Sequence, residues 1–493
     1  MQKSLFPKNT FSEQDNQSSG RKKTIRRQDL NPSQYEAVTY LDGPLLVVAG
    51  AGSGKTRTLV YRVAHLLELG ILPENLLLLT FTRRAAQEML WRASLLLDES
   101  CQDVAGGTFH AMANMLLRRY GYHIGYPPNF TIIDRSDAEG IINILKSALS
   151  LAGAGKRFPT KRVILNMISK AVNRSMDLES LLYDEYEHLE EFLGDIILLH
   201  DHYEKFKFEH GLMDYDDRLV NLREVLKENQ QVRQEISARF RYVMVDEYQD
   251  TNAIQAEIVR LIAAAHDNVM AVGDDSQSIY SFRGADFRNI MDFPQIFPNT
   301  RIIKLEENYR STQPILSMTN AIIEQADEKY TKTLFTKVEG GSKPELYNAA
   351  DAGEEAGFVA KKIAELQQEG LSLKEMAVLF RSGFHSYKLE IELASRGIPF
   401  EKRGGLKLTE SAHIKDMLSY FRILVNDQDN LSWNRILLLL DKVGPKTAEK
   451  VLAALKSAED PFAALAEYPA APGWRKGLVE LAAVLQIVKD PGP

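Results

Sequence analysis

The chain has 493 residues, 44% of them hydrophobic and 26% charged, and a formal net charge of −7. This length exceeds what one compact core usually holds, and no apolar run approaches the roughly 20 residues that a membrane span needs, so we expect several domains and no membrane anchor. The single cysteine, Cys101, excludes an internal disulfide and favours the cytoplasm, while the net charge leaves the partner open because a nucleic-acid site needs only a local basic groove.

The chain begins with a polar arm, residues 1–29, which is rich in Gln, Ser, Asn and basic residues. Few large apolar residues follow Phe11, so we expect this arm to be disordered. Ordered structure should start near Leu30, with a helix beginning at Asn31–Ser33.

A strand, a glycine-rich turn, a helix and a second strand come next. The apolar run Pro44–Ala49 predicts the first strand, the helix should start near Lys55, and Leu76–Phe81 predicts the second strand. This order is typical of a parallel α/β sheet.

The middle of the chain interrupts this pattern with a mostly helical block from about Ala113 to His210. Strand patterns return at Arg241–Val245 and Val269–Gly273, so the helical block is inserted into the α/β domain. The elements predicted after it are two more strands and a return to helix, at Arg301–Leu305, at Glu375–Phe380 and from about Ala412.

The turn after the first strand has the pattern of a phosphate-binding loop. Its glycines let backbone N–H groups surround phosphates, Lys55 can reach the outer phosphates, and Thr56 can bind Mg²⁺. A chance glycine-rich turn is the alternative, and a similar segment at Ala152–Lys156 lacks both a preceding strand and the Ser or Thr after the lysine. The residues expected around the nucleotide phosphates are Ala49, Gly50, Ala51, Gly52, Ser53, Gly54, Lys55 and Thr56.

An acidic pair ends the strand that precedes residue 246. Asp246 at the strand tip can hold Mg²⁺, and Glu247 can orient and deprotonate an attacking water. A solvated acidic loop fits poorly with the apolar run Tyr242–Val245 before it. Together with Lys55, the pair indicates nucleoside triphosphate hydrolysis.

Six ordered segments make the chain resemble the UvrD/Rep/PcrA family of superfamily 1 DNA helicases. The order and spacing of the family's motifs match from Leu30 to about residue 450. The matching segments are Asn31–Gln34, Thr80–Met89, Gly107–His110, Asp246–Asn252, Gly273–Ala285 and Leu305–Thr312.

The resemblance implies roles around ATP and Mg²⁺. Gln34, with help from Arg57, would hydrogen-bond the adenine edge, and Tyr309 would stack on the base. Arg310 would contact the γ-phosphate from a second motor domain, and Gln277 would sense that phosphate. The catalytic set implied is Lys55, Glu247, Gln277 and Arg310, with Thr56 and Asp246 as metal ligands.

The resemblance also implies a path for single-stranded DNA. Tyr280 and Phe282 would stack on bases without reading sequence, although the family usually has Trp at position 282. Core packing is the alternative for each aromatic residue, and Arg83 stands where the family usually has Asn. The other residues implied along the strand are Phe81, Thr82, Thr108, His110, Arg283 and Arg381.

The implied fold is α/β, with two RecA-like P-loop motor domains that each carry a mainly helical insertion. ATP would bind between the motors, and the family moves in the 3′-to-5′ direction on single strands and at single-strand/duplex junctions. The expected boundaries are an arm at 1–29, a first motor at 30–112 and 208–299, its insertion at 113–207, the first part of a second motor at 300–411, and a second insertion from 412 to 493. Within that last stretch, Leu440–Ala448 resembles a helix-hairpin-helix, or else a simple helix–helix turn.

Two motifs with which family members continue, a Thr-x-His-x-x-Lys-Gly type and a last one with a second γ-phosphate arginine, do not occur before Pro493. We therefore expect a fragment of a longer protein or a degenerate one, with little DNA-stimulated ATP hydrolysis by residues 1–493 alone. Three hypotheses stay open: a helicase or translocase in DNA repair or replication restart, an ATP- and DNA-binding module without motor activity, and a subunit of a helicase–nuclease.

The arm carries one further resemblance. Gln2–Phe6, with the sequence QKSLF, resembles the pentapeptide that binds the bacterial sliding clamp: Gln, then Ser or Asp, then Leu-Phe. Leu5 and Phe6 would fill an apolar pocket while the arm keeps the motor mobile. The alternative is a disordered tail that matches by chance.

Overall fold

The structure is a computed structural model that describes residues 27–97, 101, 103–151, 158–403, 412–458 and 460–489. It divides into two units, residues 1–342 and 343–493, which are described separately below. The sliding-clamp resemblance at Gln2–Phe6 and the glycine-rich segment Ala152–Lys156 lie outside the described residues.

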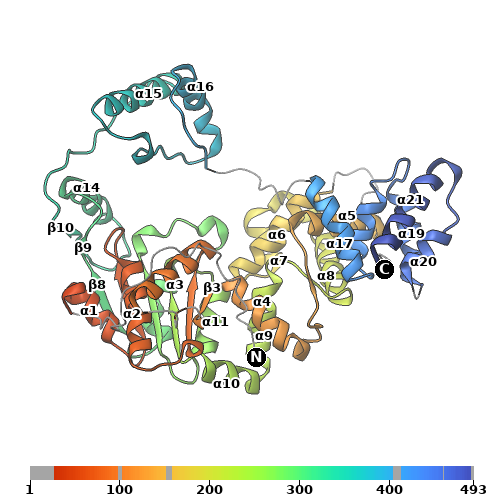
Figure 1. The fold of residues 1–493 in the computed structure, drawn as a ribbon, viewed down its shortest axis with the longest axis horizontal. Coiled ribbons are helices and arrows are strands. Elements are labelled where there is room, and N and C mark those ends of the chain that lie inside the picture. The colour runs from red at the N-terminus through yellow and green to blue at the C-terminus, as the bar shows by residue number, and fades with distance from the viewer. Residues whose placement is uncertain are drawn as a thin grey trace, which may run out of the picture. The chain divides into compact units, whose positions relative to one another are not determined.

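The first unit is organised around a parallel sheet (Figure 1). In the described part of this unit, six strands pair in the order β3-β2-β6-β7-β1-β8, and every pairing between them is parallel. The strands are β1 (Leu45–Ala49), β2 (Leu76–Thr80), β3 (Ala105–Thr108), β6 (Tyr242–Val245), β7 (Val269–Gly273) and β8 (Arg301–Leu305). The α/β fold and five of the predicted strands are thereby confirmed.

Strand β3 was not predicted, because its sequence Ala-Gly-Gly-Thr has no β-branched or aromatic residue before Thr108. It is a strand because its backbone pairs with β2, where Leu78 lies beside Gly106. A side chain at Gly106 would collide with Leu90 of the helix above, so a close packing contact explains the glycine.

Both faces of the sheet are covered by helices, which is why the inner strands β1, β2, β6 and β7 are almost entirely apolar, whereas the edge strand β8 exposes Arg301 and Lys304. Leu45 and Val47 face one cluster of buried side chains, whereas Leu46 and Val48 face the other. The helices on the first face are α1 (Pro32–Thr39), α2 (Lys55–Glu68) and α3 (Arg83–Leu97). Those on the second face are α4 (Phe109–Tyr120), α9 (Asp217–Glu228), α10 (Gln230–Arg239), α11 (Ala253–Ala263), α12 (Arg288–Met291) and α13 (Phe293–Ile296).

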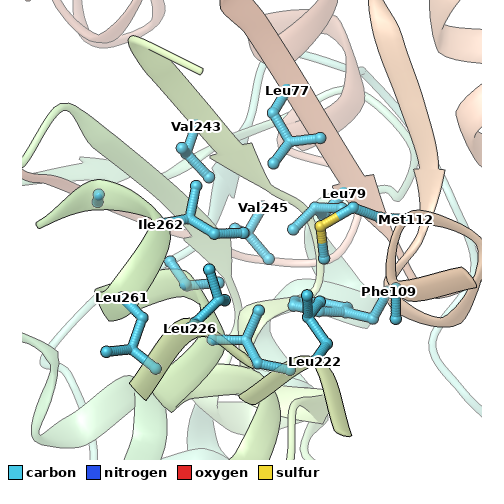
Figure 2. Close-up of a cluster of buried hydrophobic side chains, with 14 of the residues drawn as sticks. Leu77, Leu79, Phe109, Met112, Leu222, Leu226, Val243, Val245, Leu261 and Ile262 are labelled. Carbon is cyan, nitrogen blue, oxygen red and sulfur yellow. The ribbon is translucent and has the colours of Figure 1, made fainter. Parts of the chain in front are cut away.

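Figure 2 shows the second face, where Leu79 and Val245 of the strands lie with Phe109, Met112 and Leu222 of α4 and α9. Full burial of each such side chain stabilises the fold by about 1.5–3 kcal/mol. These helices therefore hold the ends of the strands, and the loops after them, in place.

A helical block separates α4 from α9, as the sequence predicts. It contains α5 (Arg135–Ala148), α6 (Lys161–Arg174), α7 (Leu178–Glu185) and α8 (Leu193–Glu209). At its base, β4 (Thr131–Ile132) pairs with β5 (Leu212–Met213), so the chain leaves and re-enters the α/β layer at one place.

The first unit continues past the predicted boundary at residue 300. Strand β8 pairs with β1 in the first sheet, and β9 (Glu307–Asn308) then pairs with β10 (Phe335–Thr336) across helix α14 (Gln313–Ile323). The domain boundaries as a whole stay a prediction.

The second unit is helical in its described residues. Helices α15 (Ala352–Gln368) and α16 (Tyr387–Ser395) pack through Ala356, Ala360 and Leu389. The strand predicted at Glu375–Phe380 is not present: this apolar run has no strand partner among the described residues, and Leu379 is 93% exposed. An apolar pattern alone does not make a strand without a neighbour to hydrogen-bond.

Five further helices of this unit share a core around Trp433 and Phe462. The predicted helix-hairpin-helix turn lies between two of them, with Lys442 at a positive φ of 61° and Gly444 at the next helix start. The helices are α17 (Ala412–Val425), α18 (Asn430–Leu437), α19 (Pro445–Lys456), α20 (Pro461–Glu467) and α21 (Pro472–Lys489). None of the described helices in either unit has the length and hydropathy to cross a bilayer.

Candidate functional site

Apart from Gln34, which lies in α1 before β1, the predicted site residues of the first unit lie at or after the carboxyl ends of the six strands. Parallel strands end at one edge of a sheet, so the loops after them meet there. The predicted DNA residues of this unit follow β2, β3 and β7, and the predicted phosphate residues follow β1 and β8. The loops after β6 and β7 lie between those after β2 and β1. The strand order therefore separates two sides of a site and joins them through the acidic and glutamine-bearing loops.

The phosphate loop has the backbone that its glycines permit. Gly52 and Gly54 have φ of 81° and 91°, in the left-handed region that favours glycine. A Cβ on Gly52 would lie 2.6 Å from the Cβ of Arg310, so the space is also closed to a side chain. Lys55 then begins α2, whose first N–H groups point toward the loop.

The loop lysine and the predicted general base form an ion pair. Lys55 Nζ lies 2.8 Å from Glu247 Oε2, and Gln249 Nε2 donates to the same oxygen at 2.9 Å. Glu247 itself has φ of 50°, an uncommon conformation for a residue with a side chain and one that costs about 1–3 kcal/mol. The surrounding contacts therefore hold Glu247 at a defined point beside the phosphate loop.

Asp246 has the surroundings of a cation ligand. It is 6% exposed, and its Oδ1 has no hydrogen-bond partner among the described residues. Burial, reinforced by the charge of Glu247 and opposed by Lys55, raises the pKa of Asp246 to about 7. A divalent cation at this position would stabilise the ionised form, so the residue fits Mg²⁺.

Thr56 lines the same cleft as Asp246, as the predicted metal pair requires. Within the described residues, no group of three or more His, Cys, Asp or Glu side chains could hold a metal. Mg²⁺ commonly takes one or two protein oxygens and completes its shell with water and substrate phosphates, so Thr56 and Asp246 would supply a sufficient number of protein ligands.

The residues predicted around adenine lie next to the phosphate loop. Gln34 is 1% exposed; its Nε2 donates to Ser53 O at 3.0 Å, and its Oε1 accepts from Asn31 N at 3.2 Å. Asn31 Nδ2 donates to the Tyr309 hydroxyl at 3.0 Å, and Arg57 donates to a backbone oxygen at 2.6 Å. Gln34 therefore braces the loop in this structure, and its contact with a base stays a prediction.

One cleft of about 700 Å³ joins the two sides of the site. It lies within the first unit and is polar on the phosphate side and aromatic on the other. Its lining includes Thr56, Asp246, Glu247, Gln277 and Arg310 from the predicted ATP set, and Phe81, Thr82 and Tyr280 from the predicted DNA set.

The aromatic residues form a row along the surface. The ring centroids of Phe81 and Tyr280 are 5.1 Å apart, and those of Tyr280 and Phe282 are 5.9 Å apart. Phe282 is 62% exposed and Phe81 is 42% exposed, which excludes core packing as the reason for either side chain. The row thus offers exposed flat faces next to the cleft.

The other predicted DNA residues do not form part of this row, and their surroundings differ from one residue to the next. Thr108 Oγ1 accepts from Ala111 N and caps α4. His110 stacks on Tyr215 at 3.8 Å, and burial together with Arg218 lowers the pKa of His110 to about 3, so its imidazole is neutral at physiological pH. Arg283 lies in the turn after Phe282, and Arg381 is exposed in the second unit.

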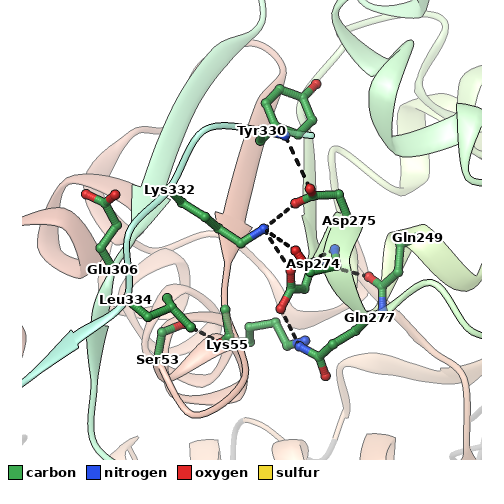
Figure 3. Close-up of polar contacts among 12 residues, drawn as sticks. Ser53, Lys55, Gln249, Asp274, Asp275, Gln277, Glu306, Tyr330, Lys332 and Leu334 are labelled. Carbon is green, nitrogen blue, oxygen red and sulfur yellow. Dashed lines mark hydrogen bonds and ion pairs between the residues drawn. The ribbon is translucent and has the colours of Figure 1, made fainter. Parts of the chain in front are cut away.

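Two residues at the site escaped sequence reasoning. Gln249 Oε1 accepts from Asp274 N at 3.0 Å and so links the acidic loop to the loop after β7. Lys332, with a side chain that is 4% exposed, contacts Asp274 and Asp275 (Figure 3). Gln249 lies inside the acidic motif and could have been noticed, whereas Lys332 is 57 residues from Asp275 and carries no local signal.

A parallel sheet with a phosphate loop after its first strand and an acidic pair after another defines a P-loop NTPase. The sequence matches the UvrD/REP helicase N-terminal domain over residues 30–298 and the UvrD-like helicase C-terminal domain over residues 303–465. The chain therefore belongs to the UvrD/REP helicase family, which confirms the predicted family and the fold class with two motor domains.

Similar curated proteins are named ATP-dependent DNA helicase PcrA. The one from Staphylococcus epidermidis is 37% identical over 444 residues, which are 89% of this chain and 60% of the relative. One from Staphylococcus aureus is 36% identical over 424 residues, which are 86% of this chain and 57% of the relative. The chain thus spans about 60% of the length of these relatives.

Proposed function

We propose that the chain is the motor part of a cytoplasmic ATP-dependent DNA helicase that moves along single-stranded DNA. The observation that carries the proposal is one cleft that is lined both by predicted ATP residues, Asp246 and Glu247 among them, and by Phe81 and Tyr280, whose row of rings continues to the exposed Phe282. The relatives' names, which include ATP and DNA, support the same substrates. The direction, 3′ to 5′, and a role in DNA repair or replication restart are proposed from the family alone.

In this proposal the phosphates of ATP lie on the loop Ala49–Thr56. Lys55 and Arg310 contact the outer phosphates, and Mg²⁺, held by Thr56 and Asp246, neutralises the charge that develops on them. Glu247 takes the proton of the attacking water. Gln34, Arg57 and Tyr309 contact the base.

The ion pair between Lys55 and Glu247 suggests how binding prepares hydrolysis. In the structure, the two side chains neutralise each other at 2.8 Å. A triphosphate offers Lys55 more negative charge than one carboxylate does, so Lys55 turns toward it. Glu247 is then free to accept a proton, while Gln249 still donates to it and holds its position.

The loop after β7 links hydrolysis to DNA movement. Gln277, on the phosphate side, is three residues from Tyr280, on the aromatic side, and both line the cleft. Loss of the γ-phosphate contact by Gln277 would shift this short loop and the stacked row of Tyr280 and Phe282 with it. The remaining strand contacts proposed are Thr82, Thr108, His110, Arg283 and Arg381.

Phe282→Ala should weaken binding of a single-stranded oligonucleotide by about 1–3 kcal/mol, because one base loses its stacking partner. Phe282→Trp should bind at least as well as the wild type. Fluorescence anisotropy with oligonucleotides of different sequence measures both, and the loss should not depend on sequence.

Tyr122→Ala is the matched control, since Tyr122 is an equally exposed aromatic residue, at 60%, whose ring lies against His123 and not in the row of Phe81, Tyr280 and Phe282. This control should leave DNA affinity unchanged. Equal affinity of the Phe282→Ala variant and the wild type would contradict the proposed strand path.

We also propose that residues Gln2–Phe6 tether the motor to a bacterial sliding clamp, on the sequence resemblance alone. A peptide of residues 1–12 should bind the clamp in the micromolar range, about −8 kcal/mol. A peptide with Leu5→Ala and Phe6→Ala should not bind, because the apolar pair that fills the pocket is gone. Calorimetry measures this binding. If the peptide does not bind at high micromolar clamp concentration, the resemblance of Gln2–Phe6 to the clamp-binding pentapeptide is a chance match.

A further inference from the structure

Lys332 forms a buried ionic cluster with two adjacent carboxylates. Its Nζ lies 2.9 Å from Asp274 Oδ1, contacts Asp275 Oδ1 and donates to Ser276 Oγ at 3.1 Å. Asp274 and Asp275 are 2% and 6% exposed, so Lys332 supplies the charge that makes their burial tolerable. The cluster also accepts the backbone N–H of Tyr330, at 3.2 Å from Asp275 Oδ2.

Asp274 also contacts Gln277 and so connects Lys332 to it. The second oxygen of Asp274 accepts from Gln277 Nε2 at 2.6 Å, while the first is held by Lys332. Figure 3 shows this chain of contacts. Because one carboxylate bridges the two side chains, the place of Lys332 sets the place of the Gln277 carboxamide.

The segment that carries Lys332 also contacts the two other phosphate-binding elements. The side chain of Leu334 covers Gly50, where an added Cβ would come within 2.5 Å of it. The next residues, Phe335–Thr336, form β10 and pair with β9, directly before Tyr309 and Arg310.

The backbone N–H and carbonyl of Leu334 are both hydrogen-bonded to the side chain of Asn320. Its N–H donates to Asn320 Oδ1 at 3.1 Å, and its carbonyl accepts from Asn320 Nδ2 at 2.8 Å. The segment is therefore anchored to α14, and it joins the loop of Gln277, the phosphate loop and the strand before Arg310 within five residues.

We propose that Lys332 is a positioning residue which, through Asp274, sets Gln277 against the γ-phosphate and ties its movement to that of Arg310. This inference rests on the proposed ATP site. Lys332 itself touches no substrate: it acts by holding the loop Asp274–Gln277 at a fixed distance from the strand that leads to Arg310.

The test compares nucleotides that differ in the γ-phosphate, using the full chain. Lys332→Met keeps the length of the side chain and removes its charge, but it leaves two buried carboxylates without a counter-charge and so endangers folding. The working variant is therefore Lys332→Met with Asp275→Asn. It removes one negative charge together with the positive one and does not substitute Asp274 or Gln277.

Competition against a fluorescent nucleotide gives the dissociation constants of ATPγS and ADP. In the double variant, the preference for ATPγS over ADP should fall by about 10-fold or more, because a small displacement of a preorganised group is enough for such a loss. ADP affinity should stay within about two-fold of the wild type, since the phosphate loop is intact. A purely structural role of Lys332 would weaken the binding of both nucleotides.

A second measurement asks whether Lys332 acts through Gln277. Gln277→Ala alone should lower the same preference, and adding it to the double variant should lower it no further, because the two changes remove one interaction. Lys329→Met is the control: Lys329 lies three residues before Lys332, and among the described residues its amine donates to the backbone carbonyls of Glu324 and Ala326.

These measurements distinguish a failure of the role proposed for Lys332 from a failure of the proposed ATP site. A wild-type preference for ATPγS that persists in the double variant, or that falls additively with Gln277→Ala, overturns the role of Lys332 and leaves the ATP site standing. A wild-type chain that binds neither nucleotide overturns the proposed function and this inference with it.

Discussion

Glu247→Gln should slow ATP hydrolysis by about 10²–10⁴-fold, the contribution of a positioned general base. A carboxamide keeps the shape of the side chain and its contact with Gln249, but it cannot accept a proton from water. Nucleotide binding should persist and can become tighter, because the substitution also removes the ion pair that competes for Lys55. Single-turnover hydrolysis measures the first effect, and ATPγS binding measures the second.

Glu235→Gln is the matched control for this substitution. Glu235 pairs with Arg119 at 2.7 Å, as Glu247 pairs with Lys55, but it does not line the cleft. Its replacement should leave hydrolysis unchanged. Normal hydrolysis by the Glu247→Gln variant would remove Glu247 from the role of base and leave the acidic loop without an assigned proton acceptor.

Lys55→Ala should lower ATP hydrolysis by about 10²–10³-fold, as the loss of one preorganised charge at a reacting phosphate does elsewhere. Unlike Glu247→Gln, it should also weaken ATP binding, because the amine contacts the ground-state phosphates. It further leaves Glu247 without its cation, so the negative charge of Glu247 repels the incoming triphosphate.

The two variants therefore differ in binding and not only in rate. Equilibrium binding of ATPγS and single-turnover hydrolysis, measured on the same preparation, separate them. Lys227→Ala serves as the control, since its amine pairs with Glu257 at 3.2 Å outside the cleft. If Lys55→Ala bound ATPγS like the wild type, the glycine-rich loop would not be the phosphate site.

Much of the fold followed from apolar runs. A strand buried on both faces reads as a continuous apolar run, and this signal found β1, β2, β6 and β7. The edge strand β8 has exposed Arg301 and Lys304 and was found from its three apolar residues. The same signal was wrong at Glu375–Phe380, because a run of apolar residues becomes a strand only when another strand satisfies its backbone. It also missed β3, whose Gly106 is explained by the close packing of Leu90.

Part of the candidate site could likewise be predicted from the sequence, and part could not. The phosphate loop and the acidic pair are contiguous segments whose chemistry depends on residue type and spacing, so the amino-acid sequence alone is enough to recognise each of them. Their mutual placement is not contained in that spacing, because the order of strands in a sheet is set by pairing and helix packing over long sequence distances. The distance of 2.8 Å between Lys55 and Glu247 therefore comes from the tertiary structure and not from the sequence.

The amino-acid sequence was sufficient for the family, the parallel α/β class and the residue types at the phosphate loop, because these depend on local spacing and on patterns of apolar residues. Only the tertiary structure showed that His110 has a strongly lowered pKa, since this follows from burial and from the nearby Arg218. Only the tertiary structure placed Lys332 against Asp274 and Asp275, because a buried ion pair joins segments that chain folding, and not sequence spacing, brings together.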